Sequence, residues 1–434
     1  MSQWMSRALA AHPLRANLTV HQIIQIEGDE LSDPDDPADF NPDDVNVFTP
    51  EIARCPQATY ALMRDKCPVL YRGAGMPFGM AIISRFDDVM FALRNPDIFS
   101  SAMDVQMALG TERPMIPQQI DPPEQTRFRK LLDPYFSRKR MSALAPKLRA
   151  HANELIDRFY DEGECEFDAA FAIPLPCIAF LDLMGLPHSD LDLFLSFKDN
   201  IIRPQKNHPD AVDHGLIRAD TGKQIYAYFE DVLRERRANP TEDFLGYLVQ
   251  AEIKGDRLTE TEMLDICFLQ ILAGLDTVTA TLGCNLAYLA ENPEHRQQVV
   301  DDPGKWDGAI EELLRWESPV TAIPRVLKQD VTLRDIDLKK GEMVTLLIGA
   351  ANTDDDEFGN AQDVDFARSG NRHIAFGAGA HRCLGSHLAR MELVVALEEW
   401  HKRIPQYQIK PGETPAFSVG IREALYLPLI WEPN

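Results

Sequence analysis

The sequence has no run of apolar residues long enough to cross a membrane. A transmembrane helix needs about 20 consecutive, mainly apolar residues, whereas the longest apolar runs here, such as residues 344–351, have the length of a strand. The first 26 residues contain no acidic side chain, as in a transit peptide, but they lack an apolar segment followed by a cleavage site of small residues. We therefore expect a cytoplasmic protein that neither crosses a membrane nor is secreted.

Cysteine is scarce and irregularly spaced. The seven cysteines are odd in number, lie far apart and form no Cys-x-x-Cys pair. This pattern does not fit a disulfide framework or a zinc site built on them, and it agrees with a reducing cytoplasm. We interpret six of them as small buried apolar side chains. The seventh, Cys383, has different surroundings.

Basic side chains are in deficit. The chain has 44 lysines and arginines against 68 acidic residues, so its net charge is -24. This charge argues against nucleic acid or an anionic membrane as the main partner. A local group of basic residues therefore stands out from the rest of the chain.

The chain of 434 residues is expected to form one large domain behind an N-terminal arm. Residues 1–45 form this arm, because residues 28–45 are acidic and rich in proline and bury too little apolar area to fold; residues 46–434 form the domain. The fold class is mainly α with small β-sheets (α+β). Helices are predicted at 50–66, 87–94, 123–136, 146–162, 216–237, 260–290, 307–316 and 384–404. Strands are predicted at 81–84, 331–333, 343–348 and 425–431, with a turn at 339–341.

One loop concentrates the chemistry. Residues 376–385 read FGAGAHRCLG, and a helix is expected to begin at Leu384. A helix N-terminus offers unpaired N–H groups and a partial positive charge, which would lower the pKa of the Cys383 thiol and suit a metal-bound sulfur. Gly377 and Gly379 allow positive φ and a close approach to a flat ligand. Gly385 leaves room for that ligand.

Three other interpretations compete for this loop. A buried structural cysteine would not need three glycines around it. A dinucleotide-binding loop requires Gly-x-Gly-x-x-Gly, but the third glycine position is Arg382. A zinc site would need partners at ligand spacing, and only His381 and His387 are near.

The loop resembles the signature of the cytochrome P-450 superfamily, Phe-x-x-Gly-x-x-x-Cys-x-Gly, at every fixed position. The resemblance extends from about Val69 to Trp431 and is strongest to the soluble bacterial class that includes camphor hydroxylase. It implies a mainly helical fold in which heme b, iron protoporphyrin IX, lies between a long central helix and the cysteine helix. Cys383 would be the axial ligand of the iron, with Phe376 packed against the ring and the sulfur.

Two further motifs agree with this resemblance. In the long helix, Ala273 to Thr277 reads AGLDT, the family's oxygen-activation pattern. Gly274 would make room for a diatomic ligand, and Asp276 and Thr277 would relay protons as the catalytic pair. Alternatively, the Thr277 hydroxyl only bonds back to the preceding helical turn.

The second motif is Glu-x-x-Arg. Glu312 and Arg315 share one helix face at this spacing, and Arg368 matches the family's second arginine. A buried cluster of the three would hold the cysteine loop to the core, whereas an exposed pair would contribute little. The family's proline in the preceding segment is missing, since residues 358–361 read FGNA.

Other residues are placed by their alignment with the family. Arg129, Arg325 and His381 would bind the haem propionates, because cationic donors pair with carboxylates; each could instead be a surface charge. The expected substrate is small and apolar, terpenoid-like or aromatic, with Arg113 nearby and more plausibly facing solvent. The residues expected to line its pocket, each of which could equally be ordinary core, are Met115, Ile116, Leu269, Leu272, Ala273, Thr321, Ile323 and Ile421.

The implied reaction is hydroxylation by O₂, with two electrons from a [2Fe-2S] ferredoxin and its NAD(P)H-dependent reductase. A ferredoxin-docking face is predicted at a basic cluster, for which a solvated helix face is the alternative. Its members are Arg127, Arg129, Lys130, Arg138, Lys139, Arg140 and Arg382. We expect a monomer with no nucleic-acid or membrane partner. The rival functions are a peroxygenase, against which the Asp276–Thr277 pair argues, and a non-enzymatic haem-thiolate sensor or carrier.

Overall fold

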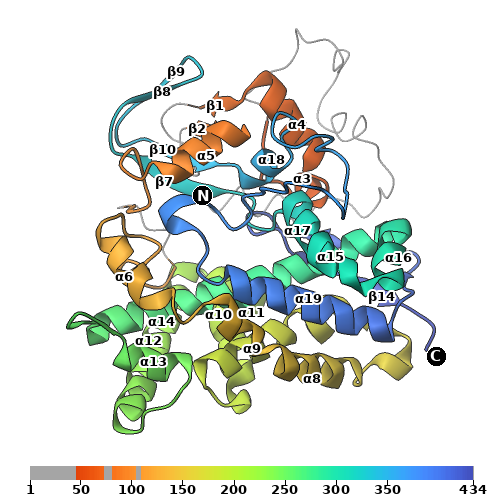
Figure 1. Ribbon diagram of the computed structural model, residues 1–434, viewed down its shortest axis with the longest axis horizontal. Helices are drawn as coiled ribbons and strands as arrows, with labels where there is room; N and C mark the ends of the chain where they lie inside the picture. The colour runs from red at the N-terminus through yellow and green to blue at the C-terminus, as the bar shows by residue number, and fades with distance from the viewer. Residues whose placement is uncertain (1–44, 73–80, 104–108, 434) are drawn as a thin grey trace.

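The computed structural model describes residues 45–72, 81–103 and 109–433. The predicted arm, residues 1–45, lies outside the described residues except for Val45. The described chain is mainly helical with small sheets, as predicted (Figure 1). The division into an arm and one domain stays a prediction.

The helices are spread over the whole described chain. The α-helices are α3 (Pro50–Arg54), α4 (Gln57–Lys66), α5 (Phe86–Arg94), α6 (Glu124–Leu132), α7 (Arg138–Ser142), α8 (Ala145–Ile156), α9 (Pro174–Met184), α10 (Leu191–Ile202), α11 (Pro204–Asn207), α12 (His214–Ala238), α13 (Phe244–Gln250), α14 (Glu260–Leu275), α15 (Thr277–Glu291), α16 (Pro293–Asp301), α17 (Trp306–Glu317), α18 (Ile348–Asn352) and α19 (Ser386–Arg403). The shorter helical turns are η2 (Tyr160–Glu162), η3 (Asp168–Ala172), η4 (His188–Asp190), η5 (Pro303–Lys305) and η6 (Gly379–His381).

The strands are short and form one five-stranded sheet and several smaller ones. The large sheet has the order β1-β2-β10-β7-β3, from β1 (Val69–Tyr71), β2 (Ala81–Ile83), β10 (Met343–Leu346), β7 (Ile323–Leu327) and β3 (Phe99–Ser100). Only the β2–β10 pair in it is parallel. The small sheets contain β4 (Glu164–Glu166), β5 (Glu252–Ile253), β6 (Asp256–Arg257), β8 (Val331–Leu333), β9 (Ile336–Leu338), β11 (Gln408–Ile409), β12 (Ala416–Phe417), β13 (Ala424–Tyr426) and β14 (Pro428–Ile430).

The sheet and the helices occupy different parts of the molecule. In Figure 1 the five-stranded sheet lies at the upper left beside α5, while α19 crosses the middle above α8 and α9. The α19 helix packs on α8, α15 and α17, and Trp400 on α19 is fully buried in the apolar core that these helices share. The segment before α19, which contains Cys383, therefore lies between the sheet region and the helical region.

The central helix is interrupted, which corrects the single helix predicted at 260–290. It ends at Leu275 and resumes at Thr277, with Asp276 at φ −105° and ψ −34° between α14 and α15. The Thr277 hydroxyl donates to the Ala273 carbonyl at 2.9 Å, a bond that commonly bends a helix. A capping box of Thr259 and Glu262 defines the start of α14, as this pattern does in general.

By length and composition alone, the stretch formed by α14 and α15 could span a membrane. The stretch Glu260–Glu291 passes such a test, but 72% of its most apolar window is buried inside the protein. A buried central helix explains this composition without a membrane.

Other predicted bounds shift by a few residues, and some helices were missed. The helix predicted at 50–66 divides into α3 and α4 at Pro56, and the one predicted at 384–404 begins later, at Ser386. The missed α9 is apolar all round, and nine of its eleven residues are buried. A helix without a polar face shows no amphipathic periodicity, so its sequence pattern could not reveal it.

Candidate functional site

The cysteine loop is closed by its own backbone. The Cys383 N–H donates to the Phe376 carbonyl at 2.8 Å, and the Gly377 N–H donates to the Ile374 carbonyl at 2.8 Å. Gly377 and Gly379 have φ of 67° and 66°, as the sequence predicts. A Cβ at position 379 would lie 2.4 Å from the Leu93 carbonyl oxygen of α5, so only glycine fits there.

The predicted lowering of the Cys383 pKa is wrong. Although the residue is exposed, the protein packed around its sulfur raises the thiol pKa by burial; the Gly385 N–H and the guanidinium groups of Arg129, Arg382 and Arg390 lower it, but only in part. The helix begins at Ser386, later than predicted. The local donors and cations thus act in the predicted direction, and a bound metal cation would stabilise the thiolate further.

A second contact, not predicted from sequence, holds the aromatic side of the loop. The Arg390 guanidinium lies 4.3 Å over the centre of the Phe376 ring and donates to both Glu311 oxygens, at 2.5 and 2.8 Å. His373 also contacts Glu311, at 3.0 Å. Burial would raise the pKa of Glu311, but the hydrogen bonds from Arg390 and His373 lower it to about 2. Phe376 is thus fixed from α17 and α19 together.

The Glu-x-x-Arg pair and Arg368 come together in a buried cluster. Glu312 and Arg315 are both 0% exposed; Arg315 donates to Glu312 at 2.7 and 2.9 Å, and Arg368 donates to both Glu312 oxygens at 3.0 Å. Arg315 also binds the carbonyls of Asn352, Ala361 and Asp363. The segment lacking the family's proline is therefore held by arginine donors.

Two of the three residues predicted to bind propionates lie in a cationic and incompletely satisfied pocket. Arg325 is 9% exposed and makes one hydrogen bond within the described chain, to the Pro324 carbonyl; burial lowers its pKa to about 10. His381 Nε2 is buried without a partner among the described residues. Burial, and then the charge of Arg325, lower the His381 pKa to about 4.

Arg129 differs from these two. It donates to the Arg382 carbonyl at 2.6 Å and pairs with Asp133 at 2.8 Å, so part of its guanidinium group already has partners within the protein. Its charge still lowers the pKa of His381, which places it in the same electrostatic environment. Its role toward a propionate stays a prediction.

The glycines near the predicted cofactor differ in what they face. A Cβ at Gly385 would meet no protein atom within 4 Å, whereas one at Gly274 would lie 3.2 Å from the Phe180 ring of α9. Gly385 thus borders open space, as a flat ligand beside Cys383 requires. Gly274 instead permits close packing of α14 on α9, and its predicted contact with a bound diatomic molecule remains untested. With the Arg325 guanidinium and the His381 ring nitrogen as donors, the loop fits a flat, dianionic, metal-containing cofactor.

The acid of the predicted catalytic pair is tied into a buried ion network. Asp276 is 0% exposed and accepts from Arg203 at 2.8 and 3.1 Å and from Lys198 at 3.3 Å. Arg203 also pairs with Glu423 near the C-terminus. Burial, and then the charge of Asp276, raise the pKa of Glu423. The sequence did not reveal Lys198, Arg203 or Glu423, because they lie far from Asp276 along the chain.

The predicted lining residues fall into groups. Met115, Ile116 and Leu269 belong to one buried apolar cluster, and Leu272 packs against it. Thr321 donates to the Gly420 carbonyl beside the Val320–Ile421 bridge, and Ile323 packs against the cluster of the five-stranded sheet. Ala273 is exposed and Thr277 half-buried. The face of the helix that carries the AGLDT motif therefore borders accessible space, but its contact with a substrate is untested.

Arg113 is partly exposed, as predicted, with 37% of its side chain accessible, but it also has partners within the protein. Its Nε donates to Asp265 at 2.6 Å and its guanidinium lies 4.1 Å over the Tyr226 ring. The Tyr226 hydroxyl in turn bonds Thr111 and Asp265. These contacts tie the segment after residue 108 to α12 and α14.

The predicted docking face is smaller than expected. Arg127 is neutralised by Asp256 and Glu262, and Arg129 by Asp133. The remaining members are exposed and have no acidic partner within 4.0 Å among the described residues. They are Lys130, Arg138, Lys139, Arg140 and Arg382.

Comparison with known proteins identifies the family. The family model for cytochrome P-450 matches residues 184–302 and 306–402. A probable cytochrome P-450 127A1 of Sinorhizobium fredii is 36% identical over 365 residues, which cover 83% of this chain and 86% of that one. The chain belongs to the cytochrome P-450 family. A steroid C26-monooxygenase of Mycobacterium tuberculosis is 32% identical over 398 residues, 90% of this chain and 96% of that one.

Solved structures agree with this assignment. CYP109E1 from Bacillus megaterium in complex with testosterone has a TM-score of 0.79 at 28% identity, covering 88% of this chain and 100% of that one. CYP109Q5 from Chondromyces apiculatus has a TM-score of 0.81 at 28% identity, covering 90% and 98%. This cytochrome P-450 thus has the predicted fold and is a haem-thiolate monooxygenase.

Proposed function

We propose that this cytochrome P-450 hydroxylates a small apolar substrate with O₂ and two electrons from a [2Fe-2S] ferredoxin. In the balanced reaction, a C–H bond, O₂, two electrons and two protons give an alcohol and water. Heme b, when bound with a cysteine thiolate, supplies oxygen activation and O–O cleavage. The observation that carries the proposal is the closed Cys383 loop beside Arg325 and His381. Neither side chain has an acid within 4.0 Å in the described chain, although the charge of Asp121 raises the pKa of both.

The chain's own residues would hold the cofactor from two sides. Cys383 presents its sulfur from a loop that its own N–H closes onto Phe376. Arg325 and His381 would bind the propionates, which would satisfy a guanidinium and a ring nitrogen that otherwise lack acidic partners in the described chain. Phe376, held by Arg390, would keep water from the sulfur.

Protons would come from the break in the central helix. The Thr277 hydroxyl carries a proton on the half-buried face that borders accessible space. Asp276, the residue before it, would first take up a proton from water and then pass it to the hydroxyl; Arg203 and Lys198 hold that carboxylate in place. The observed bond from Thr277 to the Ala273 carbonyl means that the hydroxyl must rotate before it can donate elsewhere.

The visible spectrum of the reduced protein under carbon monoxide tests the central proposal. A strongly red-shifted Soret band in the wild type, lost in Cys383→Ala, is expected for a thiolate ligand. Cys177→Ala is the matched control, because this buried thiol lies on α9 and its removal should leave the band unchanged. A histidine-type band in the wild type would overturn the assignment of Cys383.

The substrate class is tested by ligand-induced changes of the haem spin state. Terpenoids and aromatic hydrocarbons are expected to shift the haem to high spin because the predicted lining is apolar. Steroids belong in the same screen, since one relative is named a steroid C26-monooxygenase and one similar structure contains testosterone. A shift with aromatic acids alone would contradict the apolar interpretation.

The electron donor is tested by measuring product formation with different electron sources and by measuring how the electron-transfer rate depends on salt concentration. Product formation with NADH, a ferredoxin reductase and a ferredoxin would support the monooxygenase cycle, whereas turnover with peroxide alone would favour a peroxygenase. Failure of both, with haem bound, would favour a sensor or carrier. If Lys130, Arg138 and Lys139 form the docking face, electron transfer should slow steeply with salt, and a flat salt profile would exclude this face.

A further inference from the structure

Away from the cysteine loop, three side chains from three helical segments converge. His151 on α8, Asp182 on α9 and His188 in η4 place one ligand atom each within 4.8 Å of one another. His151 Nε2 lies 3.0 Å from Asp182 Oδ2, and His188 Nε2 lies 2.7 Å from Asp182 Oδ1. We propose that these residues form a binding site for a divalent transition-metal ion, with zinc as the representative ion.

The donor set decides the class of metal. Two imidazole nitrogens and one carboxylate oxygen suit zinc and its neighbours, whereas calcium and magnesium prefer oxygen ligands alone. Three protein ligands leave a fourth position for water. None of the three ligands is a cysteine, so the cysteine spacing carried no information about this site.

A further carboxylate lies near one ligand, just beyond hydrogen-bond distance. The Nδ1 atom of His151 lies 3.6 Å from Glu154 Oε2, while its Nε2 faces Asp182. Histidine ligands usually direct their second ring nitrogen at such a carboxylate, which orients the ring and makes the ligand more basic. The two imidazole rings are 5.1 Å apart at an interplanar angle of 73°, so they approach Asp182 from different directions.

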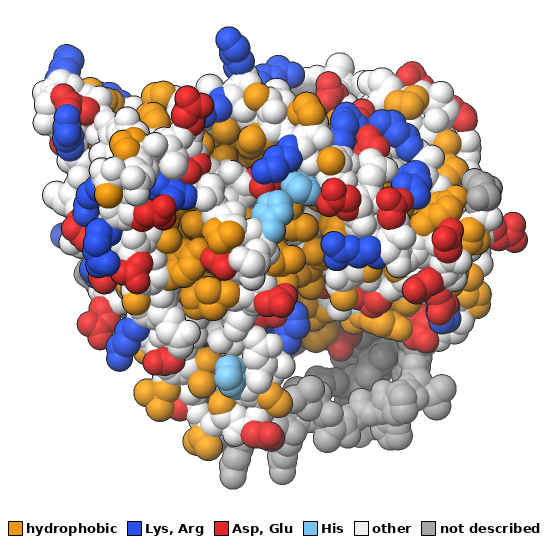
Figure 2. Space-filling model, turned by 90° about the horizontal axis from the view of Figure 1, so that it is seen from below, with side chains coloured by type: hydrophobic (Ala, Val, Ile, Leu, Met, Phe, Trp, Pro, Cys, Tyr) orange, Lys and Arg blue, Asp and Glu red, His pale blue; other side chains and the backbone are white. Residues whose placement is uncertain are grey.

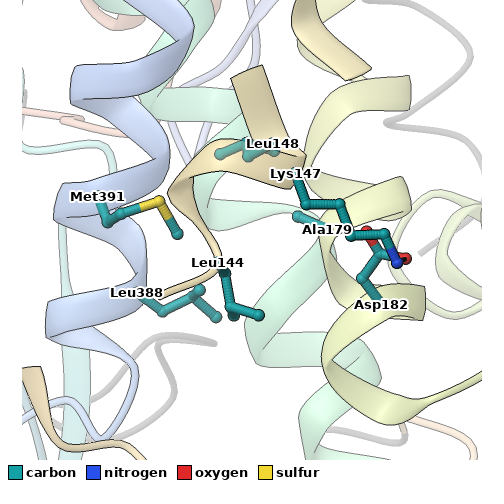
Figure 3. A pocket seen from close by; sticks show the side chains of 7 residues that line it. All are labelled: Leu144, Lys147, Leu148, Ala179, Asp182, Leu388 and Met391. Carbon is teal, nitrogen blue, oxygen red and sulfur yellow. Dashed lines mark hydrogen bonds and ion pairs between the residues drawn. The ribbon is translucent and has the colours of Figure 1, made fainter. Parts of the chain in front are cut away.

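Lys147 is the group with which the ion must compete. Its Nζ lies 2.6 Å from Asp182 Oδ1, and Figure 3 shows the two side chains pointing toward each other at one end of a crevice lined by Leu144, Leu148 and Met391.

The site is reachable from solvent. His188 is 44% exposed and Lys147 57% exposed, so the lysine can move aside as the ion enters. Figure 2 looks from below, the side on which α8 and α9 lie in Figure 1, and shows acidic, basic and histidine side chains intermingled. An ion here would join α8, α9 and η4, and η4 leads directly into α10, which carries Lys198 beside Asp276.

The experiment uses the tag-free, haem-loaded protein and zinc chloride, with calorimetry and metal analysis after dialysis. We expect one zinc ion per chain, with affinity at least tenfold lower in His151→Gln and in His188→Gln. His208→Gln, outside the cluster, is the matched control and should bind as the wild type does. Lys147→Gln should bind zinc several-fold more tightly, because the competing ammonium is gone; a merely structural role of the network would not produce this increase.

Two results would overturn the proposal. The first is a binding result: either the wild type retains no zinc, or the His151→Gln and His188→Gln variants bind zinc with the affinity of the wild type. The other is a zinc-edge X-ray absorption spectrum with sulfur ligands, near about 2.3 Å, instead of nitrogen and oxygen near about 2.0–2.1 Å. Far-ultraviolet circular dichroism and the carbon monoxide spectrum of each variant verify folding, and the exposed position of His188 makes that variant the safest.

Discussion

Two groups of polar and charged side chains contribute to the candidate site, and they differ in whether the described chain supplies their partners. In the Glu312–Arg315–Arg368 cluster, the described chain itself supplies partners for the carboxylate and both guanidinium groups. In the Arg325–His381 pocket, a cation and a neutral imidazole have no acid within 4.0 Å in the described chain, and only the more distant charge of Asp121 acts on both. The first group therefore stabilises the folded chain by itself, whereas the second is expected to stabilise the protein only when an anionic ligand is bound.

The largest effect is expected from the complete cluster. Arg315→Met should lower the free energy of unfolding by about 3–5 kcal/mol. It removes one of the two cations that pair with the buried Glu312, and it takes the donor away from the carbonyls of Asn352, Ala361 and Asp363. Urea denaturation of the variant measures this loss. Arg403→Met is the control, since its ion pair with Asp157 is partly exposed and should contribute less than about 1 kcal/mol. Equal losses in both variants would contradict the comparison.

The incomplete pocket should behave in the opposite way. Arg325→Leu should leave the apoprotein as stable as the wild type or more stable, because the cost of burying this cation outweighs its attraction to the charge of Asp121. It should nevertheless release haem about 100-fold faster, an effect of about 3 kcal/mol, measured by transfer to apomyoglobin. Arg325→Lys keeps the charge but loses the fork and should fall between the two. A destabilised apoprotein with unchanged haem retention would mean that the pocket is structural.

The Asp276 network resembles the first group in that its ion pairs are complete. It resembles the second in that we propose a functional role for its acid, which lies next to Thr277 in the chain. Asp276→Asn should reduce kcat about 100-fold while substrate binding stays near its wild-type value, as expected for loss of a proton donor. Product formation per O₂ consumed should fall in parallel in Thr277→Val. Unchanged turnover in Asp276→Asn would assign Asp276 to the ion network alone.

The smallest effect concerns a buried acid outside both groups. Burial raises the pKa of Glu392 to about 8 from its ordinary 4.5. Between these values the folded protein holds a proton that the unfolded chain releases, so this stabilising contribution is complete below about pH 4.5 and is lost as the pH rises through about 8. Glu392→Gln should therefore be more stable than the wild type at pH 8.5, by about 1–2 kcal/mol, because the buried amide offsets part of the gain.

Urea denaturation at pH 4.5 and pH 8.5 tests this dependence. The stability advantage of Glu392→Gln over the wild type should be lost at the lower pH, where only the cost of the buried amide remains. Glu294→Gln on the exposed face of α16 should show no difference at either pH. A constant difference at both pH values would show that Glu392 is not the titrating group.

Local patterns in the sequence determined much of this protein. The glycines and Cys383 of the loop, the Glu312–Arg315 spacing and the break-prone AGLDT segment all depend on conformations or contacts within a few residues. For the same reason the fold class, the family resemblance and most long amphipathic helices could be predicted. The predicted pKa of Cys383 failed because burial around the sulfur, which no local pattern reports, outweighs the nearby N–H and cationic groups.

Tertiary structure alone decided which distant groups meet. Arg203 reaches Asp276 across 73 residues of sequence and Glu423 across 220, and His151 meets Asp182 and His188 only because α8, α9 and η4 pack side by side. The helix α9, which carries Asp182, is almost wholly apolar, so its sequence has no amphipathic pattern from which a helix could be predicted. Pairings of this kind follow from how whole helices bury their surfaces against one another, and that packing is a property of the folded chain and not of any short segment.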